Sequence, residues 1–374
     1  MPPKYVLDIL KTLTARGFEA RMVGGCVRDT LMRRRPNDWD IATSAAPEEI
    51  IRSFRRTVPT GIQHGTVTVL YGGGKCEVTT YRVESAYSDH RRPDSVRFTS
   101  QLAEDLSRRD FTINAMAMDA AGAVTDLFGG REDISRKTVR CVGDPVVRFT
   151  EDALRMLRAV RFAAKLDFSI DPGTLTAMES CAHLASALSA ERVAHEVLGV
   201  LASRRPDAVW DMVSLHLLDA FISPGTGERT PLSPLPVYAR LAHWCLDLER
   251  GGYIMSTRGF LRSLRLDRRT IATASAAVEA VRSGSKDFKR LLRDYGEAAV
   301  RAAYPRSRRL RAVLRSGECW SLSSLAIGGD DAAALGFSGR ETGDVLRRAL
   351  DHVIDFPEDN EHDILCKLIK EGRI

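Results

Sequence analysis

The sequence lacks the long apolar runs that a membrane protein requires. No run approaches the roughly 18 residues that span a bilayer, and the most apolar candidate, 208–222, is interrupted by Asp211 and Asp219. The start of the chain already contains Lys4 and Asp8, so it does not read as a signal peptide. These absences argue against a membrane partner.

Cysteine is scattered, with none of the close pairs that build a site. The seven cysteines include no Cys-x-x-Cys pair, and the eight histidines show no metal-ligand spacing. A disulfide framework or a structural zinc site would need closely spaced pairs. We therefore expect free thiols in a reducing cytoplasm, and we expect His64, His90 and His195 to pack or to face solvent.

Negative charge is scarce in one segment of an otherwise ordinary composition. The 374 residues are 44% hydrophobic and 28% charged, which is typical of a globular protein long enough for two or more domains. Residues 251–315 hold 16 Lys+Arg and 5 Asp+Glu, a local charge of +11, so the rest of the chain sums to −5 within the net +6. This asymmetry favours binding to a polyanion; the plainer alternative is a set of solvated helix faces.

Strand patterns end near residue 140, and helical patterns follow. The first part predicts helices over 4–16 and 26–32, strands over 18–23 and 38–41, a hairpin of 65–71 with 76–81, and a strand over 139–142 that closes the sheet. The polar stretch 82–97 is expected to be a long loop. Later helices are expected from 151 onward and over 172–185, 190–202, 206–221, 236–249, 256–265, 268–282, 286–301, 308–316 and 340–354. The predicted fold class is therefore α+β.

The stretch from Val23 to Ala45 carries the chemistry that organises the chain. Asp38 and Asp40 are two apart on a predicted strand, so their carboxylates share one face. A glycine turn at 24–25 and a helix start precede them, and such a helix start can hold phosphate. Two carboxylates that bind divalent metal beside a phosphate site predict nucleotidyl transfer.

This chemistry calls for a third oxygen donor from a neighbouring strand. Glu77 lies on the returning strand of the hairpin, where it could face the two aspartates. Asp110 is the alternative. Both are candidates, and the sequence leaves the choice open.

Gly25, Arg28 and Arg109 are candidates for nucleotide phosphate contacts. Glycine lets the backbone approach phosphate closely, and an arginine adds a charge-assisted fork to a phosphate oxygen. The alternative for either arginine is an ion pair with a nearby acid, which would be structural. Phosphate or ligand contact is favoured for Arg28.

Asp152 and Arg155 are candidates for selecting the base. They lie three apart on the predicted helix, so they share a face. A carboxylate accepts from an exocyclic amine and a guanidinium donates to a ring nitrogen, a pair that fits cytosine and adenine but mismatches guanine and uracil. The alternative is an ordinary ion pair. Arg158 and Arg161 continue the series but drift around the helix, so phosphate contacts or packing are open for both.

The ordered motifs resemble the class II tRNA nucleotidyltransferases and bacterial poly(A) polymerases. The similar segments are Val-Gly-Gly-Cys-Val-Arg-Asp with Asp-Trp-Asp-Ile-Ala-Thr-Ser-Ala (23–45), Arg-Arg-Asp-Phe-Thr-Ile-Asn-Ala (108–115), Asp-Leu-Phe-Gly-Gly with Arg-Cys-Val-Gly-Asp-Pro (126–145), Glu-Asp-x-x-Arg (151–155) and Glu-Arg-x-x-x-Glu (191–196). The resemblance covers about residues 20–200 and continues weakly through 336–365.

The resemblance implies a five-stranded, polymerase β-like nucleotidyltransferase head followed by an all-α neck, body and tail. The expected domains are 1–140 for the catalytic head, 141–215 for the neck with the base-selecting helix, and 216–374 for a body and tail that bind tRNA. Implied roles are Mg²⁺ binding by two residues and nucleotide contacts by seven: Asp38 and Asp40 for the metal, and Gly25, Arg28, Arg109, Asp152, Arg155, Arg158 and Arg161 for ATP or CTP.

The function implied is template-independent addition of CCA to the 3′ end of tRNA from CTP and ATP. The segment from Tyr81 to Pro93 resembles the flexible loop of members that add the terminal A, so an enzyme adding only CC is not expected. An enzyme adding only A is the main alternative, and a poly(A) polymerase comes third. A non-catalytic RNA-binding protein and a small-molecule nucleotidyltransferase are alternatives of other classes. No obligate protein partner is inferred.

Overall fold

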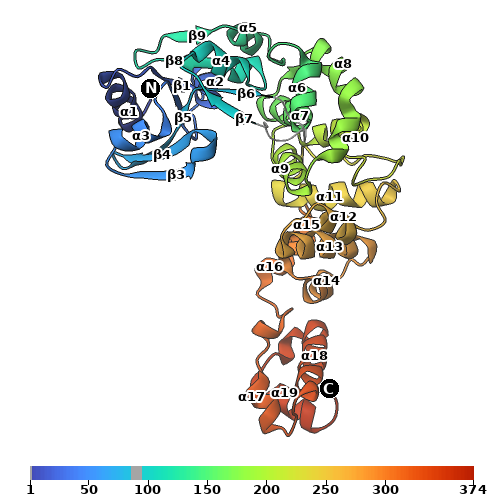
Figure 1. The fold of residues 1–374 in the computed structure, drawn as a ribbon. Coiled ribbons are helices and arrows are strands. Elements are labelled where there is room, and N and C mark those ends of the chain that lie inside the picture. Colours follow the sequence, from blue (N-terminus) through green and yellow to red (C-terminus); the bar gives the residue numbers. More distant parts are fainter. Residues whose placement is uncertain (1, 86–94) are drawn as a thin grey trace. The chain divides into compact units, whose positions relative to one another are not determined.

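The chain folds into two compact units in the computed structural model, which describes residues 2–85 and 95–374. The first unit is Met1–Phe221 and the second is Ile222–Ile374. Figure 1 traces both units along the sequence from blue to red. The α+β expectation is confirmed, because the sheet lies in the first unit and helices dominate the rest.

A mixed seven-stranded sheet forms the centre of the first unit, in the order β3-β4-β5-β2-β1-β8-β9. Within it β2 and β5 run parallel and the other neighbours are antiparallel. The strands are β1 Ala20–Val23, β2 Asp40–Thr43, β3 Thr57–Gly61, β4 Thr66–Tyr71, β5 Gly74–Thr80, β8 Met116–Met118 and β9 Val124–Asp126. The implied count of five strands is therefore wrong. Strand β3 contains Pro59 and is mostly exposed, so it has no buried alternation to detect.

Helices α1 (Lys4–Ala15), α2 (Gly25–Leu31) and α3 (Pro47–Ser53) bury their apolar faces in the same core as the sheet. Figure 1 shows α1 and α3 beside the strands. Four fully buried side chains of α1 join this core: Val6, Ile9, Leu10 and Leu13. Each contributes about 1.5–3 kcal/mol by leaving water. This packing holds the sheet that carries the candidate carboxylates.

The expected loop over 82–97 is wrong at both ends. Strand β6 (Arg82–Ser85) pairs antiparallel with β7 (Ser95–Phe98), from Arg82 opposite Phe98 to Ser85 opposite Ser95. Each strand has so few apolar residues that no period of two is visible in the sequence. The central residues 86–94 of the expected loop lie outside the described residues.

The expected strand 139–142 does not close the main sheet. Instead, β10 (Thr138–Val139) pairs in parallel with β11 (Ser169–Ile170), and Cys141 makes an isolated bridge to Phe111. The partner β11 is too short for a sequence pattern to reveal, so the pairing could not be anticipated. The further helices of the first unit are α4 Leu102–Ser107, α5 Gly130–Ser135, α6 Pro145–Glu151, α7 Leu154–Leu166, α8 Pro172–Cys181, α9 Ala190–Leu201 and α10 Val209–Ser214.

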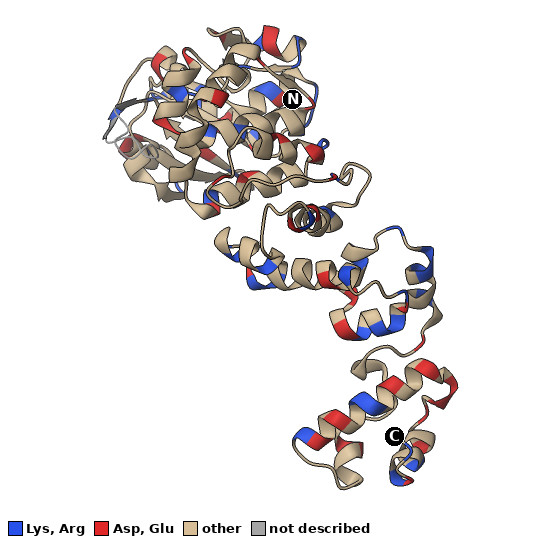
Figure 2. Cartoon of the chain, turned by 90° about the vertical axis from the view of Figure 1, so that its right-hand side faces the viewer, with Lys and Arg blue, Asp and Glu red and all other residues tan. Residues whose placement is uncertain are grey.

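The second unit is helical throughout its regular structure. Its helices are α11 Val237–Arg250, α12 Thr257–Ser263, α13 Arg268–Arg282, α14 Phe288–Tyr295, α15 Glu297–Ala303, α16 Arg308–Ser316, α17 Gly329–Ala334, α18 Arg340–Asp355 and α19 His362–Lys370. The expected helix 286–301 is divided at Gly296, whose φ of 78° breaks it. Figure 2 shows Lys and Arg recurring along helices of this unit. Within the described residues, no helix is long and apolar enough to cross a membrane.

Candidate active site

Three carboxylates lie at the start of β2 and on its neighbour β5. Strand β2 begins at Asp40, so Asp38 occupies the bend before it, and the expectation of both on one strand is wrong. The alternation nevertheless holds, because Trp39 is buried while Asp38 and Asp40 are exposed. Glu77 is the register partner of Asp40 in the parallel β2–β5 pair. Directly opposed residues of neighbouring strands share a face, so Glu77 belongs beside the aspartates.

The negative charges around Asp40 favour a bound cation. Although part of the Asp40 side chain reaches solvent, desolvation by the surrounding protein and the charge of Glu77 raise its pKa to about 6, with Arg109 opposing the shift and Asp38 adding to it. Among residues 2–85 and 95–374, no three His, Cys, Asp or Glu side chains form a ready-made metal cage. Such a cage is not required, since Mg²⁺ in phosphate-transfer sites uses one or two carboxylates plus substrate phosphates. The donor set therefore fits a divalent ion shared with a nucleotide.

A glycine turn joins β1 to α2 next to these carboxylates. Gly24 has a φ of 76°, and a Cβ there would lie 3.1 Å from Nη1 of Arg109. The backbone angle favours glycine at this position, whereas a small shift of the flexible Arg109 side chain would relieve the close approach. Gly25, the candidate from the sequence, is the first residue of α2, and the strained position is its neighbour Gly24. Its positive φ is invisible in a sequence, although the Gly-Gly pair marks the turn.

Arg28 is held by protein groups rather than facing an open site. Its side chain is only 4% exposed, and it donates to Asn114 Oδ1 at 2.6 Å. It also donates to Asp29 Oδ1 from Nε at 2.9 Å and from Nη2 at 2.7 Å. These contacts match the alternative in which Arg28 forms a structural ion pair with a nearby acid. Phosphate contact by Arg28 stays a prediction.

Arg109 reaches from the end of α4 toward the glycine turn. Its Nη2 donates to Asp105 at 3.0 Å, and its buried Nε has no hydrogen-bond partner among the described residues. Asp105 is fully buried and also accepts from Arg108 at 3.0 and 2.7 Å. Burial alone would raise the pKa of Asp105, but the charges of Arg109 and Arg108 hold it below its usual value. Nothing in the local sequence marks Asp105 as buried, so its role could not be predicted from the sequence.

The candidate base-selecting pair is not on one helix. Helix α6 ends at Glu151, and Asp152 is extended, with φ −144° and ψ 103°, before α7 starts at Leu154. Asp152 Oδ1 accepts from the backbone N–H of Leu154 at 3.1 Å. The expectation of a continuous helix with a shared face is therefore wrong. The sequence of the junction suits a helix, so only tertiary contacts reveal the break.

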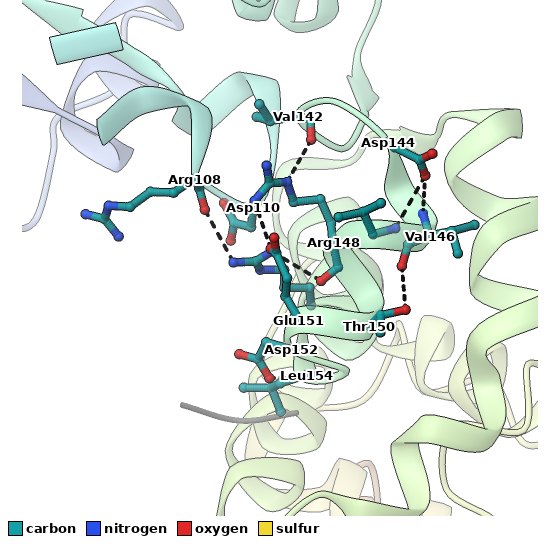
Figure 3. A network of polar contacts seen from close by, with 12 residues as sticks. Arg108, Asp110, Val142, Asp144, Val146, Arg148, Thr150, Glu151, Asp152 and Leu154 are labelled. Carbon is teal, nitrogen blue, oxygen red and sulfur yellow. Dashed lines mark hydrogen bonds and ion pairs between the residues drawn. The ribbon is translucent and has the colours of Figure 1, made fainter. Parts of the chain in front are cut away.

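The Arg155 guanidinium and the Asp152 carboxylate have separate partners at this junction. Arg155 is 7% exposed and donates to Glu151 Oε2 at 2.5 Å, to the carbonyl of Arg148 at 3.2 Å and to that of Arg108 at 3.3 Å. Figure 3 labels Arg108, Arg148 and Glu151 of this network. The backbone of Asp152 joins it, because its N–H donates to the carbonyl of Arg148 at 3.2 Å. Asp152 Oδ2 instead accepts from Arg192 of α9 at 2.7 Å.

Arg158 and Arg161 point to different acids. Asp110 Oδ2 accepts from Nε and Nη2 of Arg158 at 2.9 and 2.6 Å, whereas Arg161 donates to the buried Glu196 of α9. Their guanidinium carbons lie 5.2 and 4.5 Å from the centre of the Phe162 ring. Because Arg158 already occupies Asp110, the geometry favours Glu77 as the third carboxylate.

The mixed sheet, its paired carboxylates and the adjoining glycine turn define a nucleotidyltransferase head. The model of the poly A polymerase head domain matches residues 20–140, and that of the probable RNA and SrmB-binding site of polymerase A matches 167–227. The CCA-adding enzyme of Limosilactobacillus fermentum is 44% identical over 283 residues, 73% of this chain and 70% of that protein. The chain belongs to this family of CCA-adding enzymes, as the resemblance predicted.

Other relatives match over a smaller part of their length. The CCA-adding enzyme of Levilactobacillus brevis is 54% identical over 198 residues, 53% of this chain and 50% of that protein. The chain thus spans about half the length of several curated relatives that it matches. The crystal structure of the Bacillus stearothermophilus CCA-adding enzyme in complex with CTP is 32% identical, with a TM-score of 0.83 over 100% of this chain and 98% of that one.

A more distant structure shares the fold. The Thermotoga maritima CCA-adding enzyme complexed with tRNA is 18% identical, with a TM-score of 0.68 over 98% of this chain and 94% of that one. At this identity the likeness concerns the fold alone. Together with the Bacillus structure, it confirms the expected head and helical remainder.

Proposed function

We propose that the protein adds CCA to the 3′ end of tRNA, using CTP and then ATP without a nucleic-acid template. The observation that carries this proposal is the likeness along the whole chain to a CCA-adding enzyme crystallised with CTP. The relatives are named CCA-adding enzymes, which disfavours an A-only enzyme, a poly(A) polymerase or a non-catalytic RNA-binding protein.

In the proposed reaction, the 3′-hydroxyl oxygen of the tRNA attacks the α-phosphorus of the nucleotide. The new P–O ester bond forms as the bond between the α-phosphorus and the bridging oxygen breaks, and pyrophosphate departs with the electron pair. The proton of the hydroxyl is released to solvent water. Asp38 and Asp40 are proposed to bind Mg²⁺, with Glu77 as a third donor. When bound, the metal lowers the pKa of the attacking hydroxyl and neutralises charge on the leaving group.

The glycine turn and Arg109 are proposed to hold the triphosphate. The first N–H groups of α2 have no helical partners and can donate to phosphate oxygens from Gly25 onward. Arg109 lies over this turn, and its side chain is 19% exposed, so part of the guanidinium is accessible to a phosphate. Arg28, already paired with Asn114, is proposed to brace the turn beneath the nucleotide.

Asp152 and Arg155 are proposed to read the Watson–Crick edge of C or A. Arg192 holds the Asp152 carboxylate, so this acceptor is positioned before the base arrives. Arg155 would have to exchange Glu151 for the base, because the two are paired in the structure. Arg158 and Arg161, both paired with carboxylates, are proposed to orient α7 beside the nucleotide.

The helical second unit is proposed to bind the tRNA backbone. Its basic segment 251–315 carries the local charge of +11 that a polyanion would complement. The proposed domains are a head (1–140), a neck (141–215) and a body with tail (216–374). The boundary between the two compact units, after Phe221, lies close to the proposed boundary between neck and body and supports it. A cytoplasmic location and the lack of an obligate protein partner stay predictions.

The test offers CTP and ATP separately to two tRNAs, one ending before CCA and one ending in CC. The proposal expects C incorporation on the first tRNA with CTP and A incorporation on the second with ATP. Incorporation of A on the second tRNA, with no use of CTP on the first, would establish an A-only enzyme instead. Asp38→Ala serves as the catalytic control on both tRNAs.

A further inference from the structure

Three consecutive arginines border a hollow between the start of α1 and the loop that precedes β2. The hollow has a volume of about 1050 Å³ and lies in the first unit. Its lining includes Tyr5, Arg33, Arg34, Arg35, Asn37 and Trp39. We call this feature the arginine hollow. Asn37 and Trp39 flank Asp38 in the chain, so the hollow adjoins the loop that carries the first candidate metal ligand.

The backbone fixes the loop that presents these arginines. Helix α2 ends at Leu31, and Arg33 adopts a left-handed φ of 56° just after it. The N–H of Arg34 donates to the carbonyl of Asp29 at 2.8 Å, which ties the loop to the helix. Pro36 then fixes φ before the chain enters β2. The three side chains therefore project from a short, braced connection.

The three arginines of the hollow differ from Arg28 and Arg158 because their guanidinium groups are not paired with a carboxylate of the described residues. Within 2–85 and 95–374, the side chains of Arg33, Arg34 and Arg35 make no hydrogen bond or ion pair with the protein. By contrast, Arg28 and Arg158 are each paired with an aspartate. Three adjacent guanidinium groups repel one another, and an anion would relieve this repulsion.

We propose that the arginine hollow binds phosphodiester groups of the RNA strand whose 3′ end is extended. This inference rests on the proposed function, since it assumes that RNA reaches the carboxylates. Guanidinium groups make bidentate contacts with phosphate, and phosphate contacts set the register of a nucleic acid. A hollow at the upper limit of small-ligand pockets is larger than one phosphate needs, which favours a strand over a free ion.

The consequence is a division of labour along the RNA. The basic helices of the second unit would hold the body of the tRNA, whereas the arginine hollow would hold backbone next to the growing end. Replacing the three arginines with neutral residues should then weaken RNA binding, and the loss should depend on the salt concentration. The candidate catalytic carboxylates are not altered by this replacement.

The experiment compares Arg33→Gln/Arg34→Gln/Arg35→Gln with Arg52→Gln/Arg55→Gln/Arg56→Gln. The control removes the same charge from exposed arginines of the same unit that do not line the hollow. The affinity of each full-length variant for tRNA lacking CCA is measured without nucleotide over a range of salt concentrations. Thermal unfolding of both variants checks that they are folded.

For the hollow variant, the slope of log affinity against log salt concentration should be smaller in magnitude by about 2. Each of the three arginines would lose one single-strand phosphate contact, which contributes about 0.7 to the slope. Arg35→Gln alone should lower the slope by about 0.7, which keeps the test valid if the triple variant does not fold. The control should match the wild type.

Equal slopes for the hollow variant and the control would overturn the inference. So would an unchanged RNA slope with weaker inhibition by added pyrophosphate, because the ligand would then be free polyphosphate. If wild-type protein adds CCA while the hollow variant binds RNA normally, this inference fails alone. If wild-type protein neither binds tRNA nor extends it, the proposed function fails as well.

Discussion

Asp105→Asn should destabilise the first unit strongly, although Asp105 is not proposed to touch a substrate. The carboxylate is fully buried and accepts three hydrogen bonds, two from Arg108 at 3.0 and 2.7 Å and one from Arg109 at 3.0 Å. An asparagine removes the negative charge and turns an amide N–H toward one of the guanidinium groups. Both arginines would then lose their buried counter-charge.

The size of the effect follows from this burial. Removing one partner of a buried ion pair costs about 3–5 kcal/mol. Arg108 and Arg109 are 16% and 19% exposed, so water partly replaces the lost partner, and the lower end applies. For a unit of this size, a loss of about 3 kcal/mol lowers Tm by roughly 6–12 °C. The KM for CTP and ATP should rise too, because Arg109 would lose its anchor near the glycine turn.

The pH dependence gives a second readout. The pKa of Asp105 is lowered in the folded protein, so its stabilisation is complete above the unfolded value of about 3.9 and is lost as pH falls through the folded value. The difference in Tm between wild type and Asp105→Asn should therefore be constant near neutral pH and shrink below about pH 4.

Calorimetric unfolding of the full chain measures both effects, with Asp8→Asn as the matched control. Asp8 pairs with the exposed Lys4, so the same change there should leave Tm unaltered. A shift for Asp105→Asn no larger than that of the control would refute the reasoning.

Three further changes test other parts of the site. Asp38→Ala should lower nucleotide incorporation by at least about 1000-fold, or about 4 kcal/mol, with tRNA affinity unchanged in a filter-binding assay; residual activity near wild type would refute its metal role. Arg192→Gln should release Asp152 and reduce the preference for CTP over UTP about tenfold, since a charge-assisted hydrogen bond contributes about 1.5–3 kcal/mol; unaltered selectivity in competition assays would contradict this. Gly24→Ala should cost about 1–3 kcal/mol of stability, because its backbone conformation with positive φ disfavours a Cβ. The KM for nucleotides should rise, because the new Cβ displaces Arg109; an unchanged Tm would refute the backbone argument.

Local patterns were sufficient where an element buries one face. The apolar stripe of residues 4–16 predicts a helix, and α1 is found there with this stripe packed in the sheet core. The hairpin of 65–71 with 76–81 was predicted from its alternation and is found as β4 and β5. In these segments the apolar residues recur with the period of the helix or strand, so the buried face can be predicted from the sequence.

The break at Asp152 shows what such patterns miss. The segment Glu-Asp-Ala-Leu-Arg suits a helix, yet Asp152 is extended and is bound by Arg192, which lies 40 residues later. The same limit applies to β10, whose partner β11 is a two-residue strand. Structure that depends on a distant partner leaves no local period.

The site residues divide in the same way. Asp38 and Asp40 could be selected from their spacing and the preceding glycine turn, although only Asp40 lies in the strand. The partners of the arginines could not be selected, because the acid that meets Arg158 is Asp110, 48 residues earlier. Sequence reveals which charges are present, whereas the fold decides which of them remain available to a ligand.

The 3′-end sequence of tRNA after incubation with the enzyme tests the central claim most directly. A tRNA ending before CCA would be incubated with all four nucleoside triphosphates, and the product ends would be sequenced. The account predicts that C, C and A are added in that order and that growth then stops. Unchanged ends, added G or U, or a long A tail would contradict it.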